Sequence, residues 1–107
     1  GSAVQSLTLT PNPFTPNGDG VNDRTDIGLS VLRISDSRVL EVAVYSLAGR
    51  LVWRDERIVS AGTQTIPWDG RNGQGNLVPP GIYLVRVELD VDSGTAGTIV
   101  RTVAVAY

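Results

Sequence analysis

The sequence predicts an all-β fold, a β-sandwich of seven antiparallel strands, and two observations lead to this prediction. Apolar residues recur at every second position along most of the chain, which is the period of a half-buried strand. The chain also has 12 glycines and 6 prolines, which cluster between the periodic runs as they do in turns. No segment shows the period of an amphipathic helix. Short strands joined by turns favour two packed sheets.

Seven periodic runs are predicted to be strands. In chain order they are Val4 to Thr10, Thr25 to Ile34, Val39 to Leu47, Arg50 to Val59, Thr63 to Trp68, Gly81 to Leu89 and Thr98 to Ala106. The sixth run alternates most regularly, because its apolar odd positions are separated by residues such as Arg86 and Glu88. A strand of this kind has one buried face, and we expect it at the centre of its sheet.

Glycine, asparagine, aspartate and proline mark the connections between these runs. In the dipeptide 48–49, Gly49 supplies the positive φ of a tight hairpin. Segment 69–76 contains both Asp-Gly and Asn-Gly, which predicts a loop with several left-handed positions. Segment 79–81, Pro-Pro-Gly, fixes an extended entry into the sixth strand, because proline cannot donate to a ladder. Segment 92–94 predicts a reversal before the last strand.

The chain is expected to form one domain. Its 107 residues fit a single core, because domains usually span about 100 to 200 residues. Residues 1–2, Gly-Ser, are typical of the remnant of a cleaved expression tag, which leaves residues 3–107 for the domain. No stretch approaches the roughly 20 apolar residues that span a bilayer, so no membrane span is predicted.

Three residue types with chemically reactive side chains, His, Cys and Lys, are missing, and their absence excludes most catalytic chemistry. The sequence has no His and no Cys, which removes the usual general base, the thiol nucleophile and almost every zinc or copper site. All nine cationic side chains are Arg, so catalytic and phosphate-binding lysines are absent too. The net charge is −2, with no basic block, which argues against nucleic acid as a partner. We therefore predict a protein that is not an enzyme.

The polar stretch 15–26 resembles a calcium-binding loop. Oxygen-bearing side chains recur around a glycine at the sixth of its twelve positions, which lets them converge on one hard cation. The candidate ligands are Asn17, Asp19, Asn22, Asp23 and Asp26. They would hold one structural calcium ion, although Thr15 stands where an Asp would open such a loop. The alternative is a run of Asx turns, in which the same side chains accept backbone N–H bonds.

Two aromatic residues, Trp53 and Trp68, are candidates for a carbohydrate platform. Such a platform needs exposed rings side by side. Trp68 stands at a strand end beside a turn, where packing in the core or at a corner is the more frequent role. Trp53 precedes the charged run 54–57, which is more typical of a solvated face or a protected edge strand.

Four motifs, in order along almost the whole chain, resemble a known family. They are segment 12–23 (NPFTPNGDGVND), segment 44–52 (VYSLAGRLV), segment 68–75 (WDGRNGQG) and segment 80–83 (PGIY). Together they are similar to the immunoglobulin-like domain family named after the flagellar hook-capping protein. They are also similar to the C-terminal sorting modules of proteins exported by the type IX secretion system. The resemblance implies a seven-stranded antiparallel immunoglobulin-like β-sandwich.

The resemblance also implies which part of the module meets a partner. In such sorting modules the export machinery reads the Pro-x-Gly-x-Tyr strand and the final strand. The residues implied here are Pro80, Gly81, Tyr83, Arg101, Val103, Val105 and Tyr107. An exposed final strand would also offer unpaired N–H and C=O groups to which a partner strand can add. Many sorting modules have a basic residue close to their C-terminal end, whereas the last basic residue of this chain is Arg101.

The predicted function is that of a non-catalytic C-terminal module of a secreted or cell-surface bacterial protein, acting in secretion sorting or surface attachment. Its expected partners are proteins of the secretion or cell-surface machinery and the remainder of a larger parent polypeptide. One alternative is a carbohydrate-binding accessory module of a glycoside hydrolase. A passive spacer domain is the other.

Overall fold

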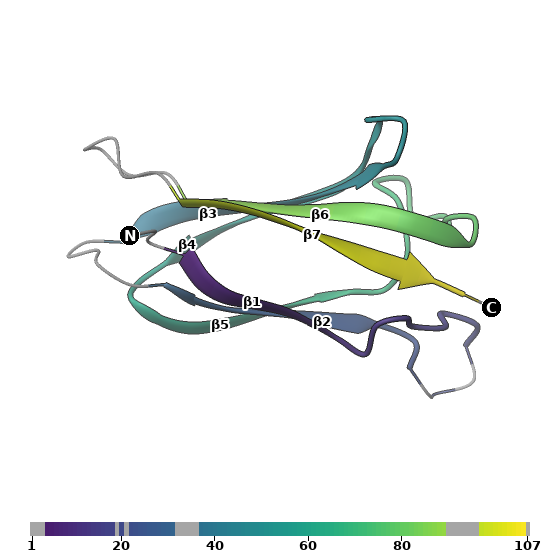
Figure 1. Ribbon diagram of the computed structural model, residues 1–107, viewed down its shortest axis with the longest axis horizontal. Helices are drawn as coiled ribbons and strands as arrows, with labels where there is room; N and C mark the ends of the chain where they lie inside the picture. The colour runs from purple at the N-terminus through teal and green to yellow at the C-terminus, as the bar shows by residue number, and fades with distance from the viewer. Residues whose placement is uncertain (1–3, 19, 21, 32–36, 90–96, 107) are drawn as a thin grey trace.

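The computed structural model describes residues 4–18, 20, 22–31, 37–89 and 97–106. In these residues, seven strands form two antiparallel sheets stacked as two layers (Figure 1). The strands are β1 (Val4–Thr10), β2 (Thr25–Val31), β3 (Arg38–Ser46), β4 (Leu51–Val59), β5 (Gly62–Trp68), β6 (Gly81–Leu89) and β7 (Gly97–Val105). The prediction of an all-β, seven-stranded sandwich is confirmed. The described residues contain no apolar helix of the length that a membrane span requires.

The two sheets differ in size and in the strands at their edges. One sheet has the order β1-β2-β5 and the other has the order β4-β3-β6-β7. Strand β6 lies between β3 and β7, as its regular alternation predicts, and every second side chain from Tyr83 to Leu89 is buried. Pro67 lies within β5, where it is tolerated because β5 is an edge strand that pairs only with β2.

The observed strand boundaries agree with the predicted ones to within one residue, with one exception. Strand β2 ends at Val31, whereas the predicted run continued to Ile34, and residues 32–36 lie outside the described residues. The predicted reversal at 92–94 also lies outside them. The predicted hairpin at Gly49 is confirmed, because this residue has a φ of 85°.

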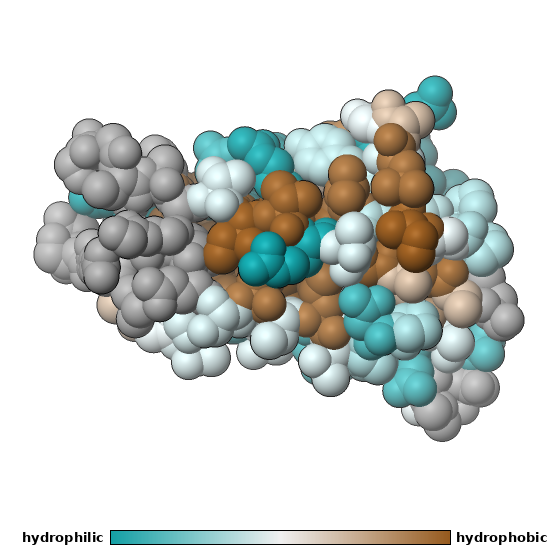
Figure 2. All heavy atoms as spheres, viewed as in Figure 1, coloured by the Kyte–Doolittle hydropathy of each residue, from teal (hydrophilic) through white to brown (hydrophobic). Residues whose placement is uncertain are grey.

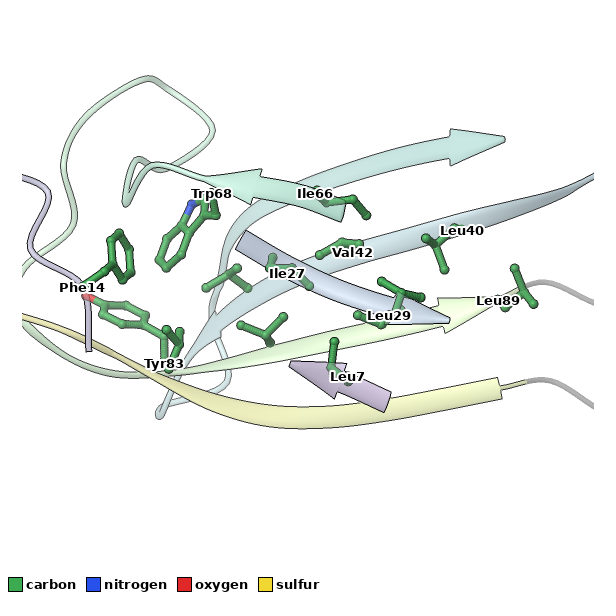
Figure 3. Close-up of a cluster of buried hydrophobic side chains, with 14 of the residues drawn as sticks. Leu7, Phe14, Ile27, Leu29, Leu40, Val42, Ile66, Trp68, Tyr83 and Leu89 are labelled. Carbon is green, nitrogen blue, oxygen red and sulfur yellow. The ribbon is translucent and has the colours of Figure 1, made fainter. Parts of the chain in front are cut away.

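The core is apolar, and its aromatic residues gather at one end. There the ring centroid of Trp68 lies 5.5 Å from that of Phe14 and 6.0 Å from that of Tyr83, both in edge-on geometry (Figure 3). Edge-to-face pairs are the arrangement that ring quadrupoles favour. Phe14 and Trp68 are 0% and 1% exposed, respectively. The expectation that Trp68 packs in the core or at a corner is confirmed.

Several connections meet at this aromatic end. The β3–β4 turn, the β5–β6 loop, residues 11–18 and the C-terminal end of β7 lie toward the same end of the sandwich, and β1 begins toward the other (Figure 1). Any polypeptide that precedes Val4 therefore joins the domain away from these loops.

Candidate functional site

The outer side of β7, an edge strand, is partly covered by the segment that precedes β2. Phe14 N donates to Ala104 O (3.1 Å), and Ala106 N donates to Phe14 O (3.0 Å). The side chain of Asn12 adds two bonds, because Nδ2 donates to Thr102 O (3.1 Å) and Oδ1 accepts from Ala104 N (2.9 Å). We call Asn12 and Phe14 the β7 clamp. The clamp occupies the C-terminal half of the β7 edge as a short extra strand would.

Among the described residues, no backbone group is paired with the outer edge of the N-terminal half of β7. The N–H and C=O groups of successive residues point to alternate sides of an antiparallel strand. The backbone groups of Thr98 and Val100 therefore point away from β6, as those of Ala104 do. Val100 O accepts a hydrogen bond from the guanidinium of Arg101 (2.9 Å). The final strand was expected to be exposed, and the structure shows that Asn12 and Phe14 cover the outer edge of its C-terminal half. An open edge promotes unwanted pairing, and the clamp covers the C-terminal half of that edge.

The partner-binding residues implied by the resemblance do not form one continuous surface. Three of them are buried in the core: Tyr83, Val103 and Val105. Three are exposed: Pro80, Gly81 and Arg101. Tyr107 lies outside the described residues. Partner binding through this region stays a prediction. Of the implied residues that are described, only the exposed Pro80, Gly81 and Arg101 could contact a partner directly.

The Pro-x-Gly-x-Tyr motif has a structural role at the start of β6. The hydroxyl of Tyr83 donates to the carbonyl oxygen of Pro79 at 2.6 Å, which ties the end of the β5–β6 loop to the strand. Gly81 has a φ of 153°, a conformation that residues with a Cβ rarely adopt. The spacing of the motif therefore follows from one backbone conformation and one hydrogen bond.

The polar loop before β2 uses Asp23 as an internal acceptor. Gly18 N donates to Oδ1 of Asp23 (2.9 Å), and Gly20 N donates to Oδ2 (2.7 Å). Asp26 lies in β2, and its carboxylate is 3.6 Å from Arg24 Nε. Asp19 lies outside the described residues, which contain no cluster of three acidic side chains suited to a metal.

Asp23 accepts backbone N–H bonds, as the turn alternative expects, but from residues that precede it rather than from the residue two positions on, as in an Asx turn. The calcium site stays a prediction. Asn17 and Asn22, the remaining candidate ligands, are exposed. Asn22 has a φ of 55°, which asparagine tolerates better than most residues. Both oxygens of Asp23 already accept backbone hydrogen bonds, so a calcium ion would share them with the loop or displace its N–H groups.

Replacing Asp23 with Asn distinguishes the two interpretations of the loop. We expect Asp23→Asn to lower the free energy of unfolding by about 1 to 3 kcal/mol, because hydrogen bonds to a charged acceptor contribute on this scale. The loss should be the same in millimolar calcium and in chelator, as measured by urea denaturation. A loss that appears only in calcium, together with a wild-type melting temperature that rises with calcium, would instead indicate a bound ion.

Trp53 and Trp68 do not form an exposed platform. Trp68 is buried, and its Nε1 donates to Arg71 O at 2.9 Å. Trp53 is half-buried on β4, with its ring centroid 6.3 Å from that of Trp68 and the ring planes tilted by 31°. Stacking on a sugar by both rings is therefore not possible in this structure, because only one ring reaches the surface.

Trp53 instead contributes to a groove between the β3–β4 turn and the β5–β6 loop. The groove has a volume of about 980 Å³ and is also lined by Leu51, Leu77, Pro79 and Tyr83. Gly73 N donates to Val52 O at 3.0 Å, which fixes the loop wall against the edge of β4. We call this feature the Trp53 groove. It is larger than a second hollow of about 220 Å³ beside Glu41, Glu56 and Glu88.

The charged run on β4 is a network on an exposed edge strand. Arg54 lies 2.9 Å from Glu41 of β3 and also pairs with Glu56, and Arg57 lies 3.0 Å from Asp55. The hydrogen bond with Glu41 raises the pKa of Arg54 above its ordinary value. The sequence interpretation of this run as a protected edge strand agrees with these pairs.

Sequence reasoning missed the β7 clamp. Asn12 is the first residue of the 12–23 motif, and its contact with Thr102 spans 90 positions. The available signal was Phe14, a large apolar residue in an otherwise polar segment. Such a residue in a loop often packs into the core.

Comparison with protein families gives one match. Residues 8–100 match the family described as the CHU_C type IX secretion signal domain. The matched range covers most of the chain, from β1 into β7. A comparison with curated proteins found no match.

Several solved structures share the fold, and three of them are described here. They are dimeric latent PorU from Porphyromonas gingivalis (TM-score 0.74, 24% identity, 94% of this chain), FlgD from P. aeruginosa (0.61, 30%, 77%) and PorZ from Porphyromonas gingivalis (0.60, 24%, 95%). PorZ is described as an essential bacterial surface component of the type IX secretion system. The aligned region spans 9%, 61% and 12% of those chains, respectively, so this chain is shorter than each of them. These likenesses and the family match confirm the resemblance that the four motifs indicated.

Proposed function

The chain belongs to the family of type IX secretion signal domains, and we propose that it directs a larger bacterial polypeptide through the type IX machinery to the outside of the cell. Membership indicates a secreted or cell-surface bacterial protein and points to a non-catalytic module. The observation that carries the proposal is the match over residues 8–100, because it includes the loops and both sheets. Its partners would be the secretion machinery and the parent polypeptide to which it is joined.

The shape of the domain is compatible with this role. The start of β1 and the C-terminal end of β7 lie toward opposite ends of the sandwich (Figure 1), so a parent polypeptide joined before β1 would leave the aromatic end free. The exposed groups there and along β7 include Pro80, Gly81, Arg101 and the open half of the β7 edge. Figure 2 shows apolar side chains at the surface on this side, with polar residues among them. A partner could recognise such a surface by shape and backbone pairing.

A reporter fusion tests the proposal. Residues 3–107 are joined to the C-terminus of a fluorescent reporter that carries a signal for export to the periplasm, in a bacterium with a type IX system. We expect the reporter on the cell surface or in the medium. It should stay in the periplasm when the module is omitted or when the strain lacks the outer-membrane translocon.

Two controls keep this test interpretable. The purified fusion is melted to show that the module is folded, since an unfolded module would be retained for other reasons. Arg101→Glu changes an exposed charge without touching the core and asks whether this side chain is read. Retention of a folded module in the wild-type strain, or release in the strain without the translocon, would contradict the proposal.

A further inference from the structure

The Trp53 groove has the shape of a site for a short peptide segment. Its floor is apolar, because Trp53 and Tyr83 line it together with Pro79. Two leucines at the groove, Leu51 and Leu77, are 50% and 43% exposed. Exposed apolar side chains beside a hollow that already has an aromatic floor are typical of sites that accept a partner side chain.

The walls of the groove are fixed before any partner arrives. Gly73 N is bonded to Val52 O, and Tyr83 is bonded to Pro79 O at 2.6 Å. Within the β5–β6 loop, the side chain of Asn72 accepts from Gln74 N (2.9 Å) and from Asn76 N (3.1 Å). A site with fixed walls loses little conformational freedom on binding, so a short segment can bind without a large rearrangement.

The charge of the groove is positive although the chain is acidic. Among the described residues that line it, Arg50 and Arg54 are the only charged ones, and none is a carboxylate. Arg54 is neutralised by Glu41 and Glu56. Among the described residues, Arg50 has no ion pair, so its guanidinium is free to bind a carboxylate.

We propose that the Trp53 groove binds an extended segment of a partner protein in which a carboxylate lies next to a large apolar side chain. The apolar side chain would pack on Trp53, and the carboxylate would accept two hydrogen bonds from the guanidinium of Arg50. The inference goes beyond the export function, because it concerns a surface separate from the β7 edge and does not depend on the secretion route.

Capped peptides test the proposal on the purified domain. The probe is acetyl-Ser-Phe-Asp-Leu-Ser-amide, and matched probes carry asparagine or lysine in place of the aspartate. We expect the acidic probe to shift the indole N–H signal of Trp53 in an NMR titration, with saturation below about 1 mM. The indole of Trp68, bonded to Arg71 O, serves as an internal reference that should not move.

Two charge variants identify the contact. Arg50→Glu should weaken binding of the acidic probe at least about tenfold, the loss expected for one charged hydrogen bond, and should favour the lysine probe. Arg101→Glu makes the same change of charge on β7, outside the groove, and should leave binding unchanged.

Three results would overturn the proposal. They are no saturable shift of the Trp53 signal, equal binding of all three probes, and a loss of affinity that is the same in both variants. Dilution of the domain without peptide supplies a fourth. A Trp53 signal that moves with protein concentration, together with a dimer in sedimentation, would mean that a second copy of the chain occupies the groove.

Discussion

Phe14→Ala is expected to lower the free energy of unfolding by about 3 to 5 kcal/mol, the range for truncating a buried phenylalanine. The side chain is fully buried and meets Trp68 edge-on, so the variant leaves a cavity at the aromatic end. Its backbone also pairs with Ala104 and Ala106, and a mobile residue 14 would release these bonds. The loss can be measured by urea denaturation monitored by tryptophan fluorescence.

Two further variants separate packing from clamping. Phe14→Leu retains most of the apolar volume and should cost less than the alanine variant. Leu47→Ala removes a side chain that is 66% exposed in the β3–β4 turn and should change stability by no more than about 0.5 kcal/mol. Equal losses for Phe14→Ala and Leu47→Ala would show that Phe14 is not a core residue.

Loss of the clamp also has a consequence for association. With Asn12 and Phe14 detached from β7, the outward groups of Thr102 and Ala104 become an unpaired edge. We expect Phe14→Ala to aggregate more readily than the wild type at equal concentration. The same edge is where an export partner could add a strand, so the clamp and such a partner would compete for the same backbone groups.

The strands were predictable because the chain alternates cleanly. In β6, every second residue from Tyr83 to Leu89 is buried, and the sequence shows the same period. The tight turn at Gly49 follows from local chemistry alone, since a positive φ there requires a residue without a Cβ. Local signals of this kind do not depend on what the rest of the chain does.

The arrangement at the aromatic end was not predictable in the same way. Asn12 and Thr102 are far apart in sequence, and no local pattern indicates that they pair. The sequence also does not show which side of β7 faces the core. Ile99, Arg101 and Val103 lie on the same side of the strand, so that side carries both apolar and charged residues. Val103 is buried, whereas Arg101 is exposed on the same side. An edge strand can place a long charged side chain at the rim of the core, and the sequence does not reveal where that rim lies.

The candidate sites show the same difference between what local sequence predicts and what depends on tertiary structure. Asp23 was one of five candidate calcium ligands, and in the structure it accepts two backbone hydrogen bonds of its own loop. Calcium binding depends on groups that local sequence does not fix, and it stays a prediction. Trp53 was correctly separated from the buried Trp68. Its groove depends on Gly73 and Pro79 of a loop that follows β5, so only the tertiary structure places that wall beside the ring.

Gly70 and Gly75 are a matched pair of glycines. Alanine variants at these two positions test whether close packing links the Asn-Pro-Phe-Thr-Pro motif to the Trp-Asp-Gly motif. Both have positive φ, 77° and 85°, so alanine at either is strained. At Gly75 a Cβ would meet nothing within 4 Å, whereas at Gly70 it would lie 2.8 Å from Cγ of Pro16 and 3.4 Å from Cε2 of Phe14. Gly70 is thus the point at which the β5–β6 loop presses against the segment that carries the clamp.

We therefore expect Gly75→Ala to cost about 1 kcal/mol, for the left-handed conformation alone. Gly70→Ala should cost about 2 to 4 kcal/mol, because overpacking adds to the same strain. Chemical denaturation of both variants measures the difference, and combining Gly70→Ala with Pro16→Ala should recover part of it, since the colliding ring is removed. Equal losses for the two glycines would mean that Pro16 moves aside freely, and that close packing does not link the Asn-Pro-Phe-Thr-Pro and Trp-Asp-Gly motifs.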